Sequence, residues 1–222
     1  MIVFPGSNCE HDVAEAIRAA GGTAELVWHR ATSLTGFDVV VLPGGFAHGD
    51  YLRAGAIARF SPVMGAVADR ASEGGSVIGI CNGFQVLTEA HLLPGALQRN
   101  AGLRFICAPI EVKVASSRSV LTRDLEIGRT LKIPINHYEG NYTCDERTLG
   151  RLIEGDEIVL RYAQNPNGSV DDIAGVCNAG GNVVGLMPHP ERASNLLMGS
   201  EDGRLLIQSL LGSVSAQAVG AA

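Results

Sequence analysis

Cysteine is scarce in this sequence, and no two cysteines stand close together. The five are scattered, odd in number and form no Cys-x-x-Cys: Cys9, Cys81, Cys107, Cys144 and Cys177. A disulfide framework would need pairs, and a structural zinc site would need ligands at short spacing. We therefore expect reduced thiols, as in a cytoplasmic protein, and no metal site in the chain.

Charge and long apolar runs are also scarce. Charged residues make up 18% of the chain and the net charge is −6, whereas a protein that binds nucleic acid normally presents a basic face. No apolar run approaches the ~20 residues that cross a membrane. Residues 1–5 lack the basic start of a signal peptide. We expect neither a nucleic-acid nor a membrane partner.

What the chain does have is a globular composition of one-domain size. It contains 222 residues, of which 46% are hydrophobic, and this is enough for a core without disulfides or metal. No repeat, charge block or clear linker interrupts the chain. We expect one domain over residues 1–212 and a frayed tail over 213–222, where small residues carry little pattern.

The first part of the chain alternates between strand and helix patterns. Ser7 or Asn8 is expected to cap the first helix, and Ser61 the second, with Pro62 at its first position. This rhythm predicts a mostly parallel sheet with helices on both faces, whose ligands bind beyond the carboxyl ends of the strands. Strands are predicted at 1–4, 24–28, 39–42 and 77–80, and helices at about 8–20, 62–72 and 84–90.

After Gly95 the pattern changes to strands with few helices between them. We expect these strands to form a small antiparallel or mixed extension of the sheet, and the fold class is therefore α/β. The predicted strands span 105–114, 131–135, 158–162, 173–177 and 183–187, and a last helix is predicted at 202–211.

The pentapeptide Gly79-Ile80-Cys81-Asn82-Gly83 lies between a predicted strand and a predicted helix. Strand, Gly-flanked turn and helix form the nucleophile-elbow pattern, with sulfur in place of the usual serine oxygen. The two glycines allow the close packing that such a strained turn needs. A helix N-terminus favours a thiolate. Cys81 is therefore the candidate nucleophile, and the alternative is a half-buried structural cysteine.

A candidate base follows the last predicted strand, in Met187-Pro188-His189-Pro190-Glu191. The two prolines favour an extended segment, in which residues two apart point to the same side. Glu191 can then hold the imidazole of His189. A Cys81–His189–Glu191 triad follows if the strand ends meet at one edge of the sheet, with His189 as proton carrier.

A candidate oxyanion site follows another strand, at Pro43-Gly44-Gly45. The backbone N–H of Gly45 can face an anion, and the N–H of Asn82 is a second donor. Gly-Gly turns are common, however, and many only turn the chain. A phosphate site is a weaker interpretation because the sequence has neither Gly-x-Gly-x-x-Gly nor a P-loop.

Three segments together resemble the class I, or triad, glutamine amidotransferases. They are Pro-Gly-Gly at 43–45, Gly-x-Cys-x-Gly-x-Gln at 79–85 and His-Pro-Glu at 189–191. Within that family, further segments resemble the glutaminase subunits of phosphoribosylformylglycinamidine synthases. These segments are residues 4–9, 44–53, 81–85, 93–97 with Asn100, and 134–140.

The resemblance implies a flavodoxin-like α/β fold and hydrolysis of glutamine to glutamate and ammonia through a thioester on Cys81. It implies that Gln85, Gly44, Asn100 and His137 contact the substrate. It implies no cofactor in this chain, because ATP and Mg would be used by the large synthetase subunit that receives the ammonia. A small bridging subunit would join the two.

Two further expectations come from the same resemblance. Asp50, Tyr51 and Arg53 are candidates for the face that meets a partner, or else form an ordinary polar loop. Relatives usually carry a few more residues before the first predicted strand, so the natural start is expected upstream of Met1.

Two other functions remain open at this stage. A flavodoxin-like cysteine hydrolase or chaperone also places cysteine at an elbow, but usually has histidine directly after it, where this chain has Asn82. A non-catalytic, redox-sensing module with a reactive thiol is the third possibility. The intact His189-Pro190-Glu191 segment argues against it.

Overall fold

A seven-stranded sheet forms the centre of the molecule in the computed structural model, which describes residues 1–4, 7–45 and 54–220. Its strand order is β3-β4-β11-β10-β9-β6-β7. The strands are β3 (Val39–Leu42), β4 (Ser76–Ile80), β11 (Val183–Leu186), β10 (Ile173–Cys177), β9 (Ile158–Tyr162), β6 (Ile106–Val114) and β7 (Thr130–His137).

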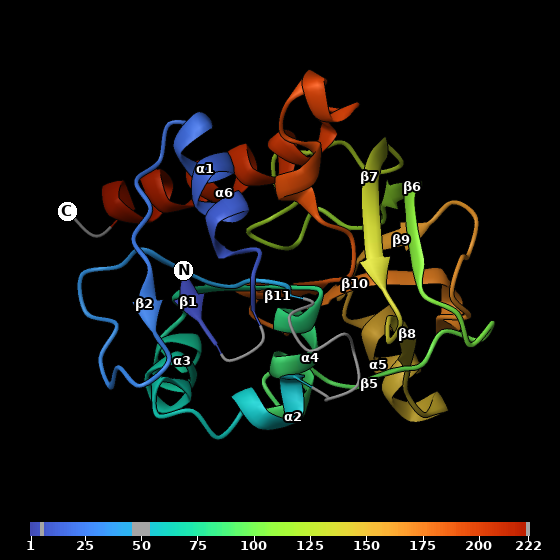
Figure 1. The fold of residues 1–222 in the computed structure, drawn as a ribbon, viewed down its shortest axis with the longest axis horizontal. Helices are drawn as coiled ribbons and strands as arrows, with labels where there is room; N and C mark the ends of the chain where they lie inside the picture. The colour runs from blue at the N-terminus through green and yellow to red at the C-terminus, as the bar shows by residue number, and fades with distance from the viewer. Residues whose placement is uncertain (5–6, 46–53, 221–222) are drawn as a thin grey trace.

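The sheet has a parallel half and an antiparallel half. β3, β4 and β11 run parallel to one another, with Leu186 opposite Ile80. From β11 through β10, β9, β6 and β7 every pairing is antiparallel. The predicted α/β class, with a parallel core and an antiparallel extension, is confirmed. The extension supplies the longest strands, β6 and β7, which stand at one edge (Figure 1).

Two small sheets accompany the large one. β1 (Ile2–Val3) pairs in parallel with β2 (Val27–Trp28), and β1 also contacts β3. β5 (Ala96–Gln98) pairs antiparallel with β8 (Asn141–Thr143). The sequence does not predict β5 or β8, because strands of three residues carry too little alternation to be recognised.

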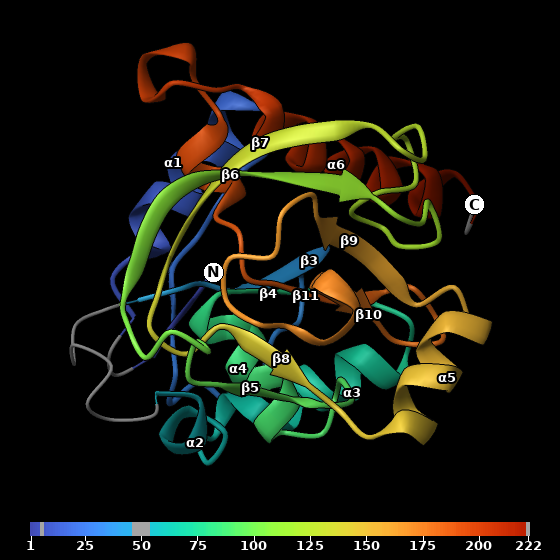
Figure 2. The same cartoon turned by 90° about the vertical axis from the view of Figure 1, so that its right-hand side faces the viewer.

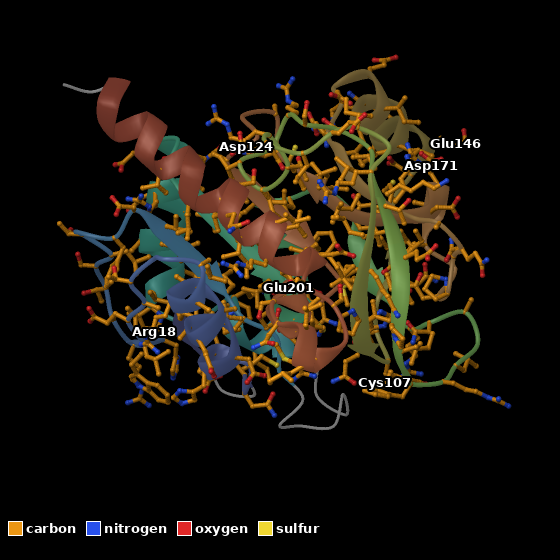
Figure 3. The ribbon with its side chains drawn as sticks, turned by 90° about the horizontal axis from the view of Figure 1, so that it is seen from above. Arg18, Cys107, Asp124, Glu146, Asp171 and Glu201 are labelled. Carbon is orange, nitrogen blue, oxygen red and sulfur yellow. The ribbon has the colours of Figure 1, made fainter. Side chains whose placement is uncertain are left out.

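Helices cover both faces of the parallel half, as the sequence predicts. α1 (Glu10–Ala19) and α6 (Asp202–Gly220) lie on one face, and α2 (Ala54–Ala58), α3 (Val63–Ser72) and α4 (Asn82–Glu89) on the other (Figures 1 and 2). Seen from above, α1 and α6 lie side by side over the sheet (Figure 3). α5 (Glu146–Glu154) follows β8.

The core lies between these helix layers and the central strands. All residues of β4 and β11 are buried, as expected for parallel strands covered on both faces. Each buried Ile or Leu, such as Ile78 and Leu186, stabilises the fold by about 1.5–3 kcal/mol. The central strands thus provide a rigid base for the loops at their carboxyl ends.

Several predicted boundaries are corrected by the structure. Cys9 is the N-cap residue of α1, and Ser7 instead bonds through Oγ to the backbone of Phe4. α3 has Pro62 as its N-cap residue, and the Ser61 hydroxyl bonds to Nδ1 of His29 and not to the helix.

The last helix also differs from its predicted length. α6 continues to Gly220, past the predicted end at Leu211 and through most of the predicted frayed tail. Ser213 is buried and its hydroxyl donates to the carbonyl oxygen of Leu210, so the tail begins inside the helix layer. The stretch after it contains alanines, which favour helix.

Among the described residues, no helix has the length and apolar character that crossing a membrane requires. The described part of the chain also contains short 3₁₀ helices. They are η1 (Val170–Asp172), η2 (Pro190–Ala193) and η3 (Leu196–Met198).

Candidate active site

Cys81 occupies a strained turn between β4 and α4. Its φ is 51° and its ψ is −108°, and it is the N-cap residue of α4. A non-glycine residue rarely adopts a positive φ, so the surrounding structure must hold it there. The N–H of Cys81 donates to the carbonyl oxygen of Leu186 at 2.8 Å, which ties the turn to β11. The structure thus forms the elbow that the sequence predicts.

The glycines on either side of the turn are required by packing. A Cβ on Gly83 would lie 1.9 Å from the carbonyl oxygen of Leu42, at the end of β3. A Cβ on Gly79 would lie 2.6 Å from the carbonyl oxygen of Gly83 and from Cδ1 of Leu87. Since real Cβ atoms do not approach so closely, the sequence needs glycine at both positions to bring α4 against the sheet.

His189 and Glu191 form a buried pair just beyond β11. Nδ1 of His189 lies 2.6 Å from Oε1 of Glu191, and the side chains are 2% and 0% exposed. The backbone N–H of His189 donates to the carbonyl oxygen of Pro134 in β7 at 2.8 Å, which fixes the segment against the antiparallel half. Nε2 of His189 has no hydrogen-bond partner among the described residues, so it is available to a reacting group.

Gly44 lies beside both the cysteine and the histidine. A Cβ on Gly44 would come within 2.9 Å of Cε1 of His189 and 3.2 Å of Cβ of Cys81. The loops after β3, β4 and β11 therefore meet at one point, as the sequence predicts. Gly44, which has no side chain, thus leaves room for Cys81 and the imidazole to lie close together, and Cys81 acts on the pKa of His189.

The pair carries a strong electrostatic bias. Burial alone lowers the pKa of His189, but Glu191 and then Cys81 outweigh burial and raise this pKa to about 10. A carboxylate beside an imidazole favours the protonated form of the ring. The histidine is thus protonated at neutral pH, in the state that can give a proton to a leaving group.

Gly45 and Asn82 lie beside the elbow. Nδ2 of Asn82 donates to the carbonyl oxygen of Gly45 at 2.5 Å, so the side chain joins the loop after β3 to the start of α4. Asn82 is the first residue of α4, and backbone N–H groups in the first turn of a helix have no acceptor within the helix. This geometry leaves the Asn82 N–H available for an oxyanion.

Gln85, Asn100 and His137 gather around a neighbouring loop. Nε2 of Gln85 donates to the carbonyl oxygen of Glu139 at 2.8 Å. Asn100 is fully buried: its Nδ2 donates to the carbonyl oxygens of Arg104 and His137, and its Oδ1 accepts from Nδ1 of His137 and from the N–H of Gly140. Asn100 therefore positions His137 and the loop that Gln85 reaches.

His137 is a neutral histidine inside this cluster. Burial, followed by the charge of His189, lowers its pKa to about 3. Because Nδ1 donates to Asn100, Nε2 carries the lone pair, and Nε2 is buried without a partner among the described residues. The orientation of His137 is set by Asn100, and its role toward substrate stays a prediction.

The sequence misses one group behind the triad. Cys9 is 2% exposed, and its Sγ lies 3.3 Å from Nη2 of Arg192. Ligand atoms of Cys9, His189 and Glu191 lie within 4.8 Å of one another, a donor set that zinc accepts. His189 and Glu191 are already bonded to each other, and the Arg192 cation opposes a metal ion, so we assign no metal here. The direct contact of Cys9 with Arg192 has no sequence signal, because 183 positions separate them.

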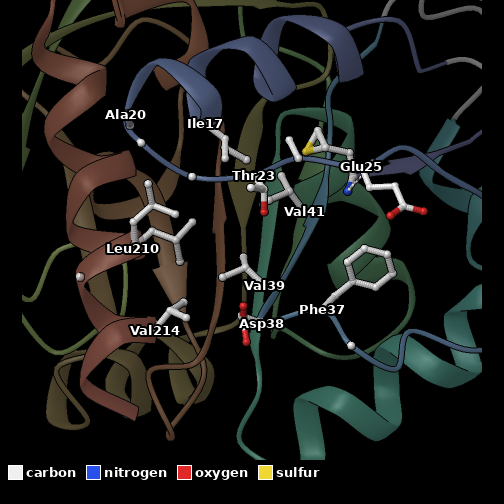
Figure 4. Close-up of a pocket in the computed structure, with 17 residues that line it drawn as sticks. Ile17, Ala20, Thr23, Glu25, Phe37, Asp38, Val39, Val41, Leu210 and Val214 are labelled. Carbon is white, nitrogen blue, oxygen red and sulfur yellow. Dashed lines mark hydrogen bonds between the residues drawn. The ribbon is translucent and has the colours of Figure 1, made fainter. Parts of the chain in front are cut away.

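A cavity of about 430 Å³ lies elsewhere, between α1, β3 and α6 (Figure 4). It opens near Val39, at the start of β3, whereas Gly44 follows the end of that strand. The ionisable side chains that line it are two carboxylates, Glu25 and Asp38. The cavity thus holds no nucleophile with a base, and the candidate chemistry stays at the carboxyl ends of the strands.

Of the remaining sequence predictions, Asp50, Tyr51 and Arg53 lie outside the described residues.

Comparison with known proteins agrees with this geometry. Residues 1–204 match the model of the CobB/CobQ-like glutamine amidotransferase domain. The chain is 55% identical over 211 residues to phosphoribosylformylglycinamidine synthase subunit PurQ of Rubrobacter xylanophilus, covering 95% of this chain and 96% of that one. It is 50% identical over 225 residues to the subunit of the same name from Koribacter versatilis, covering 97% of each.

A solved structure is similar as well. A chain of the PurLQS structure from Thermotoga maritima superposes with a TM-score of 0.88 at 41% identity, covering 96% of each chain. A putative GMP synthase protein from Thermoplasma acidophilum, at 16% identity and a TM-score of 0.65, shares the fold over 97% of this chain and 93% of that one. The chain therefore belongs to the glutamine amidotransferase family, in the branch that contains the PurQ subunits of phosphoribosylformylglycinamidine synthase.

Proposed function

We propose that this chain is the glutaminase subunit of a phosphoribosylformylglycinamidine synthase. It hydrolyses glutamine to glutamate and ammonia and passes the ammonia to an ATP-using synthetase subunit. That subunit converts formylglycinamide ribonucleotide to formylglycinamidine ribonucleotide in de novo purine synthesis. The observation that carries the proposal is that Cys81 and the hydrogen-bonded pair of His189 and Glu191 meet beside Gly44. The relatives named PurQ support the choice of complex.

The reaction follows from the charges of the site. The Cys81 thiolate attacks the carboxamide carbon of glutamine, and the resulting oxyanion accepts hydrogen bonds from the N–H groups of Gly45 and Asn82. His189 gives its proton to the departing nitrogen, so ammonia leaves and a glutamyl thioester remains on Cys81. His189, now neutral, takes a proton from water, and the hydroxide releases glutamate and restores the thiolate.

Other residues act by holding these groups in place. Glu191 accepts from Nδ1 of His189 at 2.6 Å, which fixes the tautomer and stabilises the imidazolium. We propose that Gln85 and the Gly44 backbone contact the substrate. Asn100 and His137 shape the loop that Gln85 reaches through the carbonyl oxygen of Glu139.

The proposed chemistry needs only side chains and main-chain N–H groups of this chain, with no cofactor of its own. We propose that ATP and Mg are bound by the large synthetase subunit, and that a small bridging subunit completes a cytoplasmic complex. The PurLQS assembly to which the similar chain belongs supports these partners.

The test compares the two nitrogen sources in the assembled complex. Cys81→Ser is expected to abolish glutamine-dependent synthesis and to leave ammonia-dependent synthesis intact. Cys107→Ser is the matched control, because Cys107 is a cysteine exposed on β6, and it should retain both activities (Figure 3). Loss of ammonia-dependent synthesis in Cys81→Ser would contradict the division of labour between the subunits.

A further inference from the structure

Three consecutive large apolar side chains stand exposed on η3. Leu196, Leu197 and Met198 are 71%, 94% and 53% exposed, and we call them the η3 knob. The knob lies on the loop that projects beyond the start of α6 (Figures 1 and 2). Single exposed apolar residues are ordinary on a protein surface, but a contiguous group marks a place where another molecule binds.

The η3 knob is held in a fixed shape. Oδ1 of Asn195 accepts from the N–H of Leu197 at 2.9 Å. Gly199, with a φ of 93°, donates its N–H to the carbonyl oxygen of Leu196 at 2.9 Å. Asn195 also forms a β-bridge with Ser200, which closes the loop. A surface that is ordered before binding loses little conformational entropy when a partner covers it.

A pocket of about 540 Å³ lies beside the knob, between α1 and the η2–η3 segment. Leu197 and Met198 form one wall, and α1 forms the other with apolar and acidic side chains. The acidic ones are Asp12 and Glu15, and Glu15 has no ion-pair partner among the described residues. Apolar walls with two carboxylates fit a partner segment that carries apolar side chains and a Lys or Arg. The apolar residues on the α1 side are Ala16 and Ala19.

The floor of this pocket belongs to the catalytic site. Glu191 and Arg192 both line it. The Arg192 guanidinium lies 3.6 Å from Oδ2 of Asp12 on the wall and 3.3 Å from Sγ of Cys9 behind the triad. A cation that binds Asp12 would compete with Arg192, whose charge acts on Glu191. The surface is therefore continuous with the carboxylate that holds His189.

We propose that the η3 knob and its acidic pocket are the docking surface for the synthetase subunit. Leu197 inserts into an apolar hollow of that subunit, and a basic side chain of the subunit faces Asp12 and Glu15. This inference rests on the proposed function. We choose the synthetase among the possible occupants because it consumes the ammonia. The pocket shares Glu191 with the catalytic site, so binding of the synthetase at this surface would be coupled to the site that makes the ammonia. The small bridging subunit and a second copy of this chain are the other occupants.

The test measures binding of the purified synthetase subunit to the full chain by calorimetry. Leu197→Asp should weaken binding about tenfold or more, as for an interface hot spot. Ile127→Asp is the matched control, an equally apolar residue that is 60% exposed on another loop, and it should bind like the unchanged chain. Glu15→Lys should weaken binding and flatten its salt dependence, because it reverses a charge at the rim.

Unchanged affinity in both Leu197→Asp and Glu15→Lys overturns the proposal. Loss of binding only to the bridging subunit, or loss only of self-association, also overturns it and assigns the surface to that occupant. Circular dichroism and the thermal midpoint show whether Leu197→Asp is folded. Failure of the proposed function looks different: the unchanged complex would then show no glutamine-dependent synthesis, whatever the η3 variants do.

Discussion

Two cysteines in this protein occupy the same kind of position and have opposite character. Cys9 is the N-cap residue of α1 and Cys81 is the N-cap residue of α4, and both are 2% exposed. Neither side chain makes a capping hydrogen bond. A helix N-terminus and burial are therefore common to both, and they do not by themselves make a nucleophile.

The difference lies in backbone strain and in the neighbouring charges. Cys81 has a φ of 51° and lies beside Gly44 together with His189, whereas Cys9 has an ordinary φ of −101°. Burial and then the charge of Glu191 raise the pKa of the Cys9 thiol to about 12, although Arg192 acts in the opposite direction. Cys9 is thus held as a neutral thiol, and the comparison indicates that a paired histidine and an elbow distinguish the reactive cysteine.

The largest effect should come from removing the sulfur of Cys81, and removing the sulfur of Cys9 gives the matched comparison. Cys81→Ala is expected to lower the glutaminase rate by about 10³-fold or more, since the covalent step is lost. Cys9→Ala should retain most of the rate, because Cys9 touches no reacting atom. Steady-state release of glutamate by the assembled complex measures both. Equal losses in the two variants would break the comparison and make Cys9 a second essential thiol.

A smaller loss is expected when the charge behind the histidine is removed. Glu191→Gln should lower the glutaminase rate by about 10²- to 10⁴-fold, the range of general acid–base catalysis. Glu191 raises the pKa of His189, so its removal should also move the basic limb of the pH–rate profile to lower pH. Glu201→Gln, an exposed carboxylate at the start of α6, is the control and should leave the profile unchanged (Figure 3). A Glu191→Gln profile identical to that of the unchanged chain would mean that the carboxylate does not set the histidine charge.

The packing of the elbow can be tested by comparing alanine substitution at Gly83 with the same substitution at Gly65, a glycine with open space around it. Gly83→Ala should lower the free energy of unfolding by about 1–3 kcal/mol, because its Cβ would meet the backbone of Leu42. Gly65→Ala in α3 meets no atom within 4 Å and should raise stability by about 0.5–1 kcal/mol. Urea unfolding of the isolated chain gives both values. A neutral Gly83→Ala would show that α4 can move away from β3.

The smallest effect concerns capping. Unlike Cys9, Asp145 caps its helix, α5, by accepting from the N–H of Thr148 at 2.7 Å. Asp145→Ala should therefore lower the thermal midpoint by about 2 °C. The bonds to Thr148 lower the pKa of Asp145, so the difference should be fully present above the ordinary value of 3.8 and shrink as pH falls below it. A midpoint difference that persists unchanged in acid would contradict a role for the ionised cap.

The parallel half of the fold could be predicted from sequence because its signals are local. β3 occupies its predicted residues, and α3 ends at the predicted Ser72. The elbow follows from two glycines around Cys81. The pair of His189 with Glu191 forms as predicted, but Glu191 lies in the 3₁₀ helix η2 and not in the extended segment that the two prolines favour. Short apolar runs that end in glycine are compatible with few other assignments of secondary structure.

What the sequence did not reveal depends on distant contacts. The sequence does not predict α5, although Asp145 is a favourable N-cap residue and Glu146 stands in the first turn, because the surrounding strand patterns dominate. The hydroxyls of Ser7 and Ser61 were predicted as caps, but both bond elsewhere. The role of Asn100 as the holder of His137 depends on a bond that spans 37 positions, and no local pattern encodes it.

Cys81 and His189 can lie close together because Gly44 beside them has no side chain, and this has a consequence for protein engineering. The carbonyl oxygen of Gly44 accepts from the N–H groups of Asn8 and Cys9 at 3.4 and 3.2 Å, so this glycine is fastened to the start of α1. A library that randomises position 44 has no larger residue to offer, because any Cβ there meets the imidazole. The position of this loop can instead be changed through residues at the start of α1, to which the Gly44 carbonyl oxygen is bonded.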